Sequence, residues 1–160
     1  MKPLLINNLE VAKNQETLSG EIPVSSYERL ADILDQKVEN PQKLTYQLSG
    51  STTKLHLPSL DLTIDAELPL ICQRCLSTMQ LKLSLSYEYV ISESEPGEFE
   101  GSDDIDWLEM SREMNVNELI EDELLMAIPL APTHNEDCKP VKHESGEKHN
   151  PFAALKDLIK

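Results

Sequence analysis

Two alternating stretches on either side of a C-x-x-C motif constrain the fold of this chain more than any other feature. Before the motif, the apolar side chains fall on even positions from Leu60 to Leu70, with acidic and hydroxyl side chains between them. After the motif, they move to odd positions from Met79 to Ile91. Alternation with a period of two is typical of a strand with one buried and one solvated face. The pattern predicts a long β-hairpin over about residues 59–91.

A tight turn at the Gln-Arg pair of "CQRC" would close this hairpin and set its register. Cys72 would then face Cys75, and Leu68 would lie opposite Met79, so that the apolar side chains share one face of the sheet. Gln-Arg is a poor two-residue turn, because the favoured turns need positive φ angles and normally use Asn or Gly. We therefore expect something else to hold the tip, and a metal bound by both thiolates is one candidate.

Two further ligands for such a metal stand in the polar segment "PLAPTHNEDCK". His134 and Cys138, together with Cys72 and Cys75, make a three-sulfur, one-nitrogen set of the kind that binds zinc tetrahedrally. His143 and His149 are available as substitutes for His134. Unliganded thiols are the simpler alternative, since C-x-x-C alone is not specific for metal.

The C-x-x-C motif also allows an alternative function, a thiol/disulfide-active enzyme using residues 72–75. Thioredoxin-type motifs begin a helix, where the helix dipole lowers the thiol pKa, whereas this motif lies between two predicted strands. The sequence contains no phosphate-cradling glycine loop, no G-x-S-x-G elbow and no His-Glu-x-x-His helix. We therefore expect a binding module and not an enzyme.

The remaining segments predict an α+β fold with a small antiparallel sheet around the hairpin, flanking helices and a flexible C-terminal loop. Short strands are expected at 17–23, 43–50 and 53–57. A helix is expected at 25–34, with Ser25 and Glu28 placed as a capping box. A second, amphipathic helix should begin at Asn115, which can cap it, and end before Pro129.

These elements suggest one α+β domain over residues 1–130, with an acidic loop at 93–106. A flexible polar loop at 131–150 should follow, since it contains almost no long apolar side chain. The final residues 151–160 regain a helical pattern behind an Asn-Pro start. No stretch of about 20 apolar residues and no signal-peptide core occurs, so we expect a cytoplasmic protein without a membrane span.

The charge of the chain restricts its partners. It has 29 acidic residues against 14 Lys and Arg, and its formal net charge is −15. Bare nucleic acid would be repelled by this field, whereas a basic protein or a metal ion would be attracted. Acidic side chains available for such a partner lie in the 93–106 loop and at Glu118, Glu121, Asp122 and Glu123. A solvated helix face is the simpler interpretation of the latter four.

Three motifs in order resemble the bacterial YceD family of large ribosomal RNA subunit accumulation proteins. They are "CQRCL", "NELIEDELLMAIPLAPTH" with a cysteine shortly after it, and "NPFAALKDL", and they span residues 72–158. The resemblance implies a non-enzymatic factor needed for accumulation of 23S ribosomal RNA and for assembly of the large subunit. It implies a ribosomal protein or assembly intermediate as the partner, and it leaves the oligomeric state open. Arg74, a family motif position between the two cysteines, is a further candidate contact for that partner.

Overall fold

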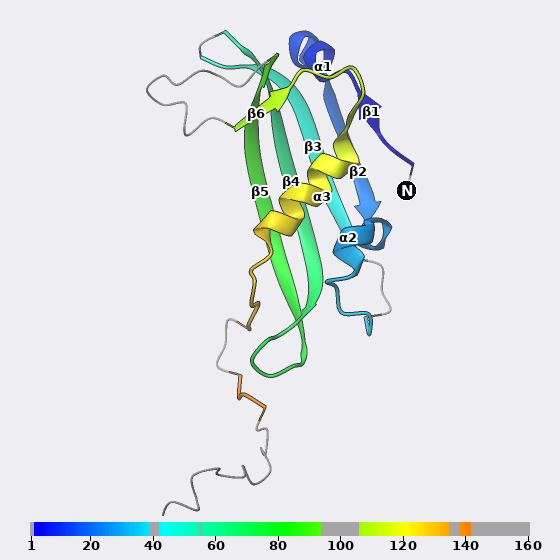
Figure 1. Ribbon diagram of the computed structural model, residues 1–160, viewed down its shortest axis with the longest axis vertical. Helices are drawn as coiled ribbons and strands as arrows, with labels where there is room; N and C mark the ends of the chain where they lie inside the picture. Colours follow the sequence, from blue (N-terminus) through cyan, green and yellow to red (C-terminus); the bar gives the residue numbers. More distant parts are fainter. Residues whose placement is uncertain (1, 39–41, 55, 94–105, 135–137, 142–160) are drawn as a thin grey trace, which may run out of the picture.

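The computed structural model describes residues 2–38, 42–54, 56–93, 106–134 and 138–141. In these residues a five-stranded sheet has the order β2-β3-β4-β5-β6, and a separate two-stranded sheet pairs β1 with β7. Figure 1 shows helix α3 lying across one face of the large sheet, α1 at the upper end of the sheet and α2 beside the lower end of β2, with the β4–β5 hairpin projecting beyond it. The predicted α+β class is confirmed.

The elements of the first half of the chain are short except for β3. They are β1 (Leu5–Ile6), α1 (Asn8–Asn14), β2 (Thr17–Pro23), the 3₁₀ turn η1 (Val24–Ser26), α2 (Glu28–Ala31) and β3 (Lys43–Thr52). The second half contains β4 (Pro58–Ile71), β5 (Thr78–Ser92), β6 (Asp106–Glu109), β7 (Met114–Asn115) and α3 (Val116–Ala127). Strands β2 to β5 are antiparallel neighbours, whereas β6 adds to the edge parallel to β5, so the sheet is mixed.

The alternation that predicted the β4–β5 hairpin also defines the core. Leu60, Leu62 and Leu68 of β4 are fully buried, and they share a face with the odd-numbered apolar residues of β5. Helix α3 covers this face with Val116, Ile120 and Leu124, which have no exposed surface. The core between α3 and the sheet is therefore mainly aliphatic, and its geometry follows from side chains that alternate across a strand and recur every three or four residues on a helix.

The predicted register of the hairpin was wrong by two residues. Leu70, not Leu68, lies opposite Met79, and residues 72–77 form the connection between the strands. The turn is wider because Leu76 takes the positive φ angle, 57°, that the Gln-Arg pair was poorly suited to adopt. A shift of two residues preserves side-chain parity, so the buried and solvated faces remain those predicted from the sequence.

Two other predicted elements were also wrong. The segment expected as a strand at 53–57 is a turn, in which Thr53 N donates to Leu57 O and His56 has a φ of 62°, outside the strand region. The helix expected at 25–34 is reduced to η1 and the short α2, and no Ser25–Glu28 capping box forms. In contrast, β2 covers the predicted 17–23, and the Asn115 side chain caps α3 by accepting from Asn117 N.

Helix α1 was not predicted, and it lies directly on strand β3. A Cβ at Gly50 would come within 2.0 Å of Val11 O and 2.8 Å of Ala12 Cα, so only glycine allows this approach. The loop after β6 is held by Asn8, whose side chain donates to Glu109 O and accepts from Ser111 N. The helical segment predicted at 151–160 and nearly all of the acidic loop predicted at 93–106 lie outside the described residues.

Candidate metal centre

The tip of the β4–β5 hairpin forms a compact turn around its two cysteines. Cys72 N donates to Ser77 O at 2.9 Å, and Leu76 N donates back to Cys72 O at 2.9 Å. The Cys72 side chain is completely buried, whereas Cys75 is half-buried and lies 2.9 Å from the Ser77 hydroxyl. The turn therefore brings both sulfurs to the inner side of the tip.

The segment that follows α3 runs back to this tip. Gln73 N donates to Pro132 O at 2.8 Å, and Val141 N donates to Arg74 O at 3.3 Å. These two backbone bonds hold the chain on both sides of His134 and Cys138, although Pro129 has ended the helix well before them. Part of the polar loop predicted at 131–150 is thus fixed against the hairpin.

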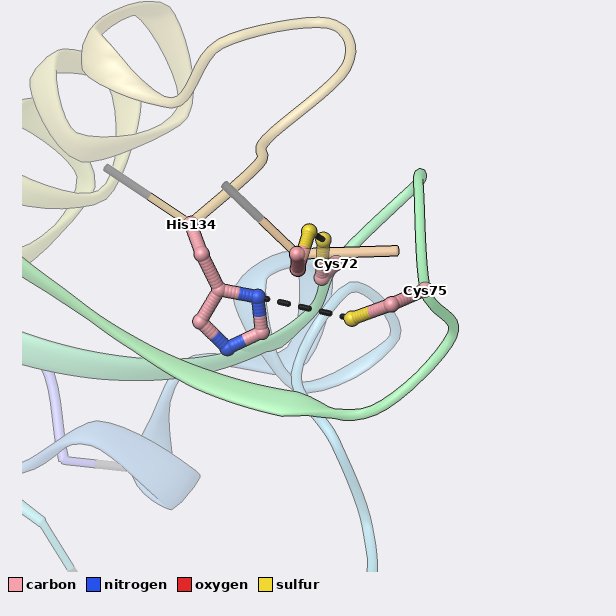
Figure 2. A group of neighbouring side chains, drawn as sticks. Cys72, Cys75 and His134 are labelled. Atoms are coloured by element: carbon pink, nitrogen blue, oxygen red, sulfur yellow. Dashed lines mark hydrogen bonds between the residues drawn. The ribbon is translucent and has the colours of Figure 1, made fainter. Parts of the chain in front are cut away.

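The four predicted ligands come together at this junction. His134 Nδ1 lies 3.5 Å from Cys75 Sγ, and Figure 2 shows the imidazole pointing at that sulfur. Cys72 Sγ lies 3.7 Å from Cys138 Sγ, and no disulfide links them. The ligand atoms of all four residues lie within 4.8 Å of one another.

These separations fit the edges of a tetrahedral zinc site. With Zn–S bonds of about 2.3 Å and Zn–N bonds of about 2.0 Å, two sulfurs are separated by about 3.8 Å and a sulfur and a nitrogen by about 3.5 Å. The observed 3.7 Å and 3.5 Å agree with both values. The donor set of three thiols and one imidazole is also one that structural zinc sites use.

The electrostatics of the cluster favour a bound cation. Burial raises the pKa of the Cys72 thiol, but N–H groups of Cys75, His134 and Arg74 directed at its sulfur outweigh burial and lower the pKa to about 5. The Ser77 hydroxyl and N–H lower the pKa of Cys75. Burial, followed by the neighbouring cysteines, raises the pKa of Cys138. A divalent ion would offset the repulsion between three thiolates and allow all of them to bind.

The acidic residues predicted to contact a partner do not form one surface. Glu118 and Asp122 are exposed on α3, and Arg74 is exposed at the hairpin tip. Glu121 and Glu123 are each only 8% exposed, so the interpretation of the four acids as one solvated face was wrong. Glu123 accepts a hydrogen bond from the Tyr89 hydroxyl at 2.6 Å.

Glu121 has a structural role that the sequence did not reveal. Its carboxylate accepts from Arg29 N at 3.0 Å and from Arg29 Nε at 3.1 Å, at the start of α2. It therefore caps α2 from α3, in place of the expected capping box. The two residues are 92 positions apart, and neither carries a local signal of the contact.

Comparison with known proteins agrees with the motif resemblance. The family model "Large ribosomal RNA subunit accumulation protein YceD" matches residues 60–159, which include most of β4, all of β5 and α3, and the four candidate ligands. The chain belongs to the YceD family. A Haemophilus influenzae protein named large ribosomal RNA subunit accumulation protein YceD is 26% identical, over 98% of this chain and 95% of its own length. No solved structure matches the chain.

The described part of this YceD-family chain contains no helix long and apolar enough to cross a membrane. Among its residues, the C-x-x-C of the family segment and the His134–Cys138 pair are the groups whose geometry points to metal chemistry.

Proposed function

We propose that this protein supports accumulation of 23S ribosomal RNA as a non-enzymatic, zinc-stabilised binding protein of the cytoplasm. Its partner would be a basic ribosomal protein or a large-subunit assembly intermediate. Membership of the YceD family supports the link to large-subunit RNA. The net charge of −15 supports a basic protein as the direct contact, because the same field repels a bare phosphate backbone.

The four-residue ligand set is the observation that favours a structural over a catalytic role. Catalytic zinc sites use three protein ligands and keep a fourth position for water or substrate. Here Cys72, Cys75, His134 and Cys138 would fill all four positions. Zinc bound in this way would join the hairpin tip to the segment after α3, and these four residues would hold it without presenting it to a substrate.

A thiol-active enzyme is the second candidate, because the pKa of Cys72 is lowered to about 5. A low thiol pKa is common among reactive cysteines. The Cys72 side chain is completely buried, however, so a substrate disulfide could not reach its sulfur without opening of the tip. This observation favours the metal-ligand role.

Exchange of Cys75 separates the two candidates. A Cys75→His variant keeps a zinc ligand and removes the dithiol, whereas Cys75→Ser removes both. Each variant would be expressed in cells depleted of the native protein, and the ratio of free 50S to 30S particles would be measured on sucrose gradients. We expect depletion to lower 50S and 23S RNA, Cys75→His to restore both, and Cys75→Ser to restore them poorly.

Zinc content provides the second readout. We expect about one zinc per chain in the native protein and in Cys75→His, and a large loss in Cys75→Ser, measured by elemental analysis at a known protein concentration. A zinc content near zero in the native protein would reject the metal centre. An unchanged 50S to 30S ratio on depletion would reject the assembly role.

A further inference from the structure

A second feature of this protein is a pocket of about 370 Å³ between α3 and the β5–β6 edge of the sheet. Two aromatic side chains, Tyr87 and Tyr89, line it together with the acidic residues Asp106 and Glu123, and Trp107 of β6 borders it. The whole chain has only one Trp, four Tyr and two Phe. An aromatic-poor protein has thus placed two of its few aromatic rings at one opening, beside two acidic groups.

The two tyrosine rings and the Glu123 carboxylate lie in contact with one another. Tyr87 and Tyr89 are stacked, with ring centroids 5.9 Å apart and an interplanar angle of 26°. Glu123 Oε1 accepts from the Tyr89 hydroxyl at 2.6 Å. Burial, and then the negative charge of Glu123, raises the pKa of Tyr87, so the phenol stays neutral beside the carboxylate.

The second oxygen of Glu123 is the observation that points to a ligand. Glu123 is 8% exposed, and within the described residues its buried Oε2 has no hydrogen-bond partner. Leaving a carboxylate oxygen buried and unpaired is costly, and a positively charged donor satisfies it best. The cost is recovered when a cation enters the pocket.

Aromatic faces beside carboxylates form a site for an organic cation. Tyrosine rings attract ammonium and guanidinium groups, and partial desolvation strengthens the attraction. Met126, at the rim, is 77% exposed and Asp106 is also exposed, so the pocket is open to solvent. Its volume is sufficient for one long side chain and too small for a folded element.

We propose that this pocket binds the cationic side chain, arginine or lysine, of a basic protein partner. The inference rests on the proposed function and deepens it, because it assigns the recognition of a basic partner to a particular place.

The pocket is far from the metal centre, so the two sites can be tested separately. About nine residues of β5 lie between Thr78 at the tip and Tyr87, which is a distance of about 30 Å along the strand. Figure 1 shows β6 and the hairpin tip at opposite ends of the sheet.

Trp107 provides a direct assay, since it is the only tryptophan in the chain. The full-length protein would be titrated at 150 mM salt with the neutral-ended peptide acetyl-Gly-Arg-Gly-Arg-Gly-amide, its lysine analogue, and a citrulline analogue that keeps the shape without the charge. We expect a saturable change in tryptophan fluorescence with the charged peptides and none with citrulline.

Two charge-neutral variants and a matched control test the site. Glu123→Gln keeps an acceptor for Tyr89 and should lower the affinity for the charged peptides about tenfold. Asp106→Asn, at an exposed position, should lower the affinity for the same peptides about threefold. Glu88→Gln is the control. Glu88 lies between Tyr87 and Tyr89 in the sequence but is exposed on the other face of β5, so loss of its charge should leave the affinity for the peptides unchanged.

Three results would overturn the proposal. They are the absence of a saturable signal with either charged peptide, an equal loss of affinity in Glu88→Gln and Glu123→Gln, and a stronger response to a uridine oligonucleotide than to the peptides. Each of these can occur while depletion of the protein still lowers 50S particles, which would leave the proposed function standing. Conversely, an unchanged 50S level with intact peptide binding would reject the proposed function but leave the pocket as a binding site for cationic side chains.

Discussion

The contact between Glu121 and the start of α2 makes a quantitative prediction about stability. In Glu121→Ala, Arg29 N loses a charged acceptor at 3.0 Å in a region that excludes most water. A hydrogen bond to a charged group contributes about 1.5–3 kcal/mol. The Arg29 side chain is 53% exposed, so the ion pair itself adds little. We expect a loss of about 2–3 kcal/mol in the free energy of unfolding.

Urea unfolding followed by circular dichroism measures this loss, and thermal melting should show a fall of about 4–12 °C. Glu118→Ala is the matched control, because Glu118 is exposed on the same helix. Glu121→Gln keeps one acceptor for the backbone and should cost less than Glu121→Ala. If Glu121→Ala costs less than about 0.5 kcal/mol, or no more than Glu118→Ala, the capping role is wrong. In that case Glu121 would again be a candidate for partner binding.

Three further perturbations follow from described contacts. Gly50→Ala should destabilise by at least about 2 kcal/mol in urea unfolding, because its Cβ meets backbone atoms of α1, whereas Ser49→Ala should be nearly neutral. The hydrogen bonds from the Thr78 hydroxyl and then from Lys37 N lower the pKa of Asp35 in the folded protein. The ionised Asp35 carboxylate therefore stabilises the fold above about pH 4, and this stabilisation is lost as the pH falls through the lowered pKa of the folded state. The Asp35→Asn variant should therefore show a flatter dependence of stability on pH below about pH 5. A strong zinc chelator should lower the melting temperature of the native protein, by the equivalent of about 3 kcal/mol or more, and readdition of zinc should restore it. Cys72→Ser should already melt low and should not respond to the chelator.

The sequence predicted those parts of the structure whose signals are local or chemically specific. Alternation fixed the faces of β4 and β5, and the few residue types that bind zinc identified Cys72, Cys75, His134 and Cys138 despite their separation in the chain. The register failed because it depends on the φ angle of Leu76, which no local pattern marks. The start of α2 was misplaced because its cap is supplied by Glu121, far along the sequence. The burial of Glu123 was missed for the same reason, since its partner Tyr89 lies on another element.

The anchoring of the N-terminal segment has a consequence for how this protein is made. Strand β1 pairs only with β7 among the described strands, and Lys2 O accepts from the Asn117 side chain. Synthesis proceeds at about 5–20 residues per second, so the first residues wait about 5–20 s before their partners exist. During that time Leu4 and Ile6, which pack against the core in the folded protein, lack their native cover. Docking of this segment must therefore wait until β7 and the start of α3 are made, and truncated chains that end before β7 should be recognised by chaperones and proteases.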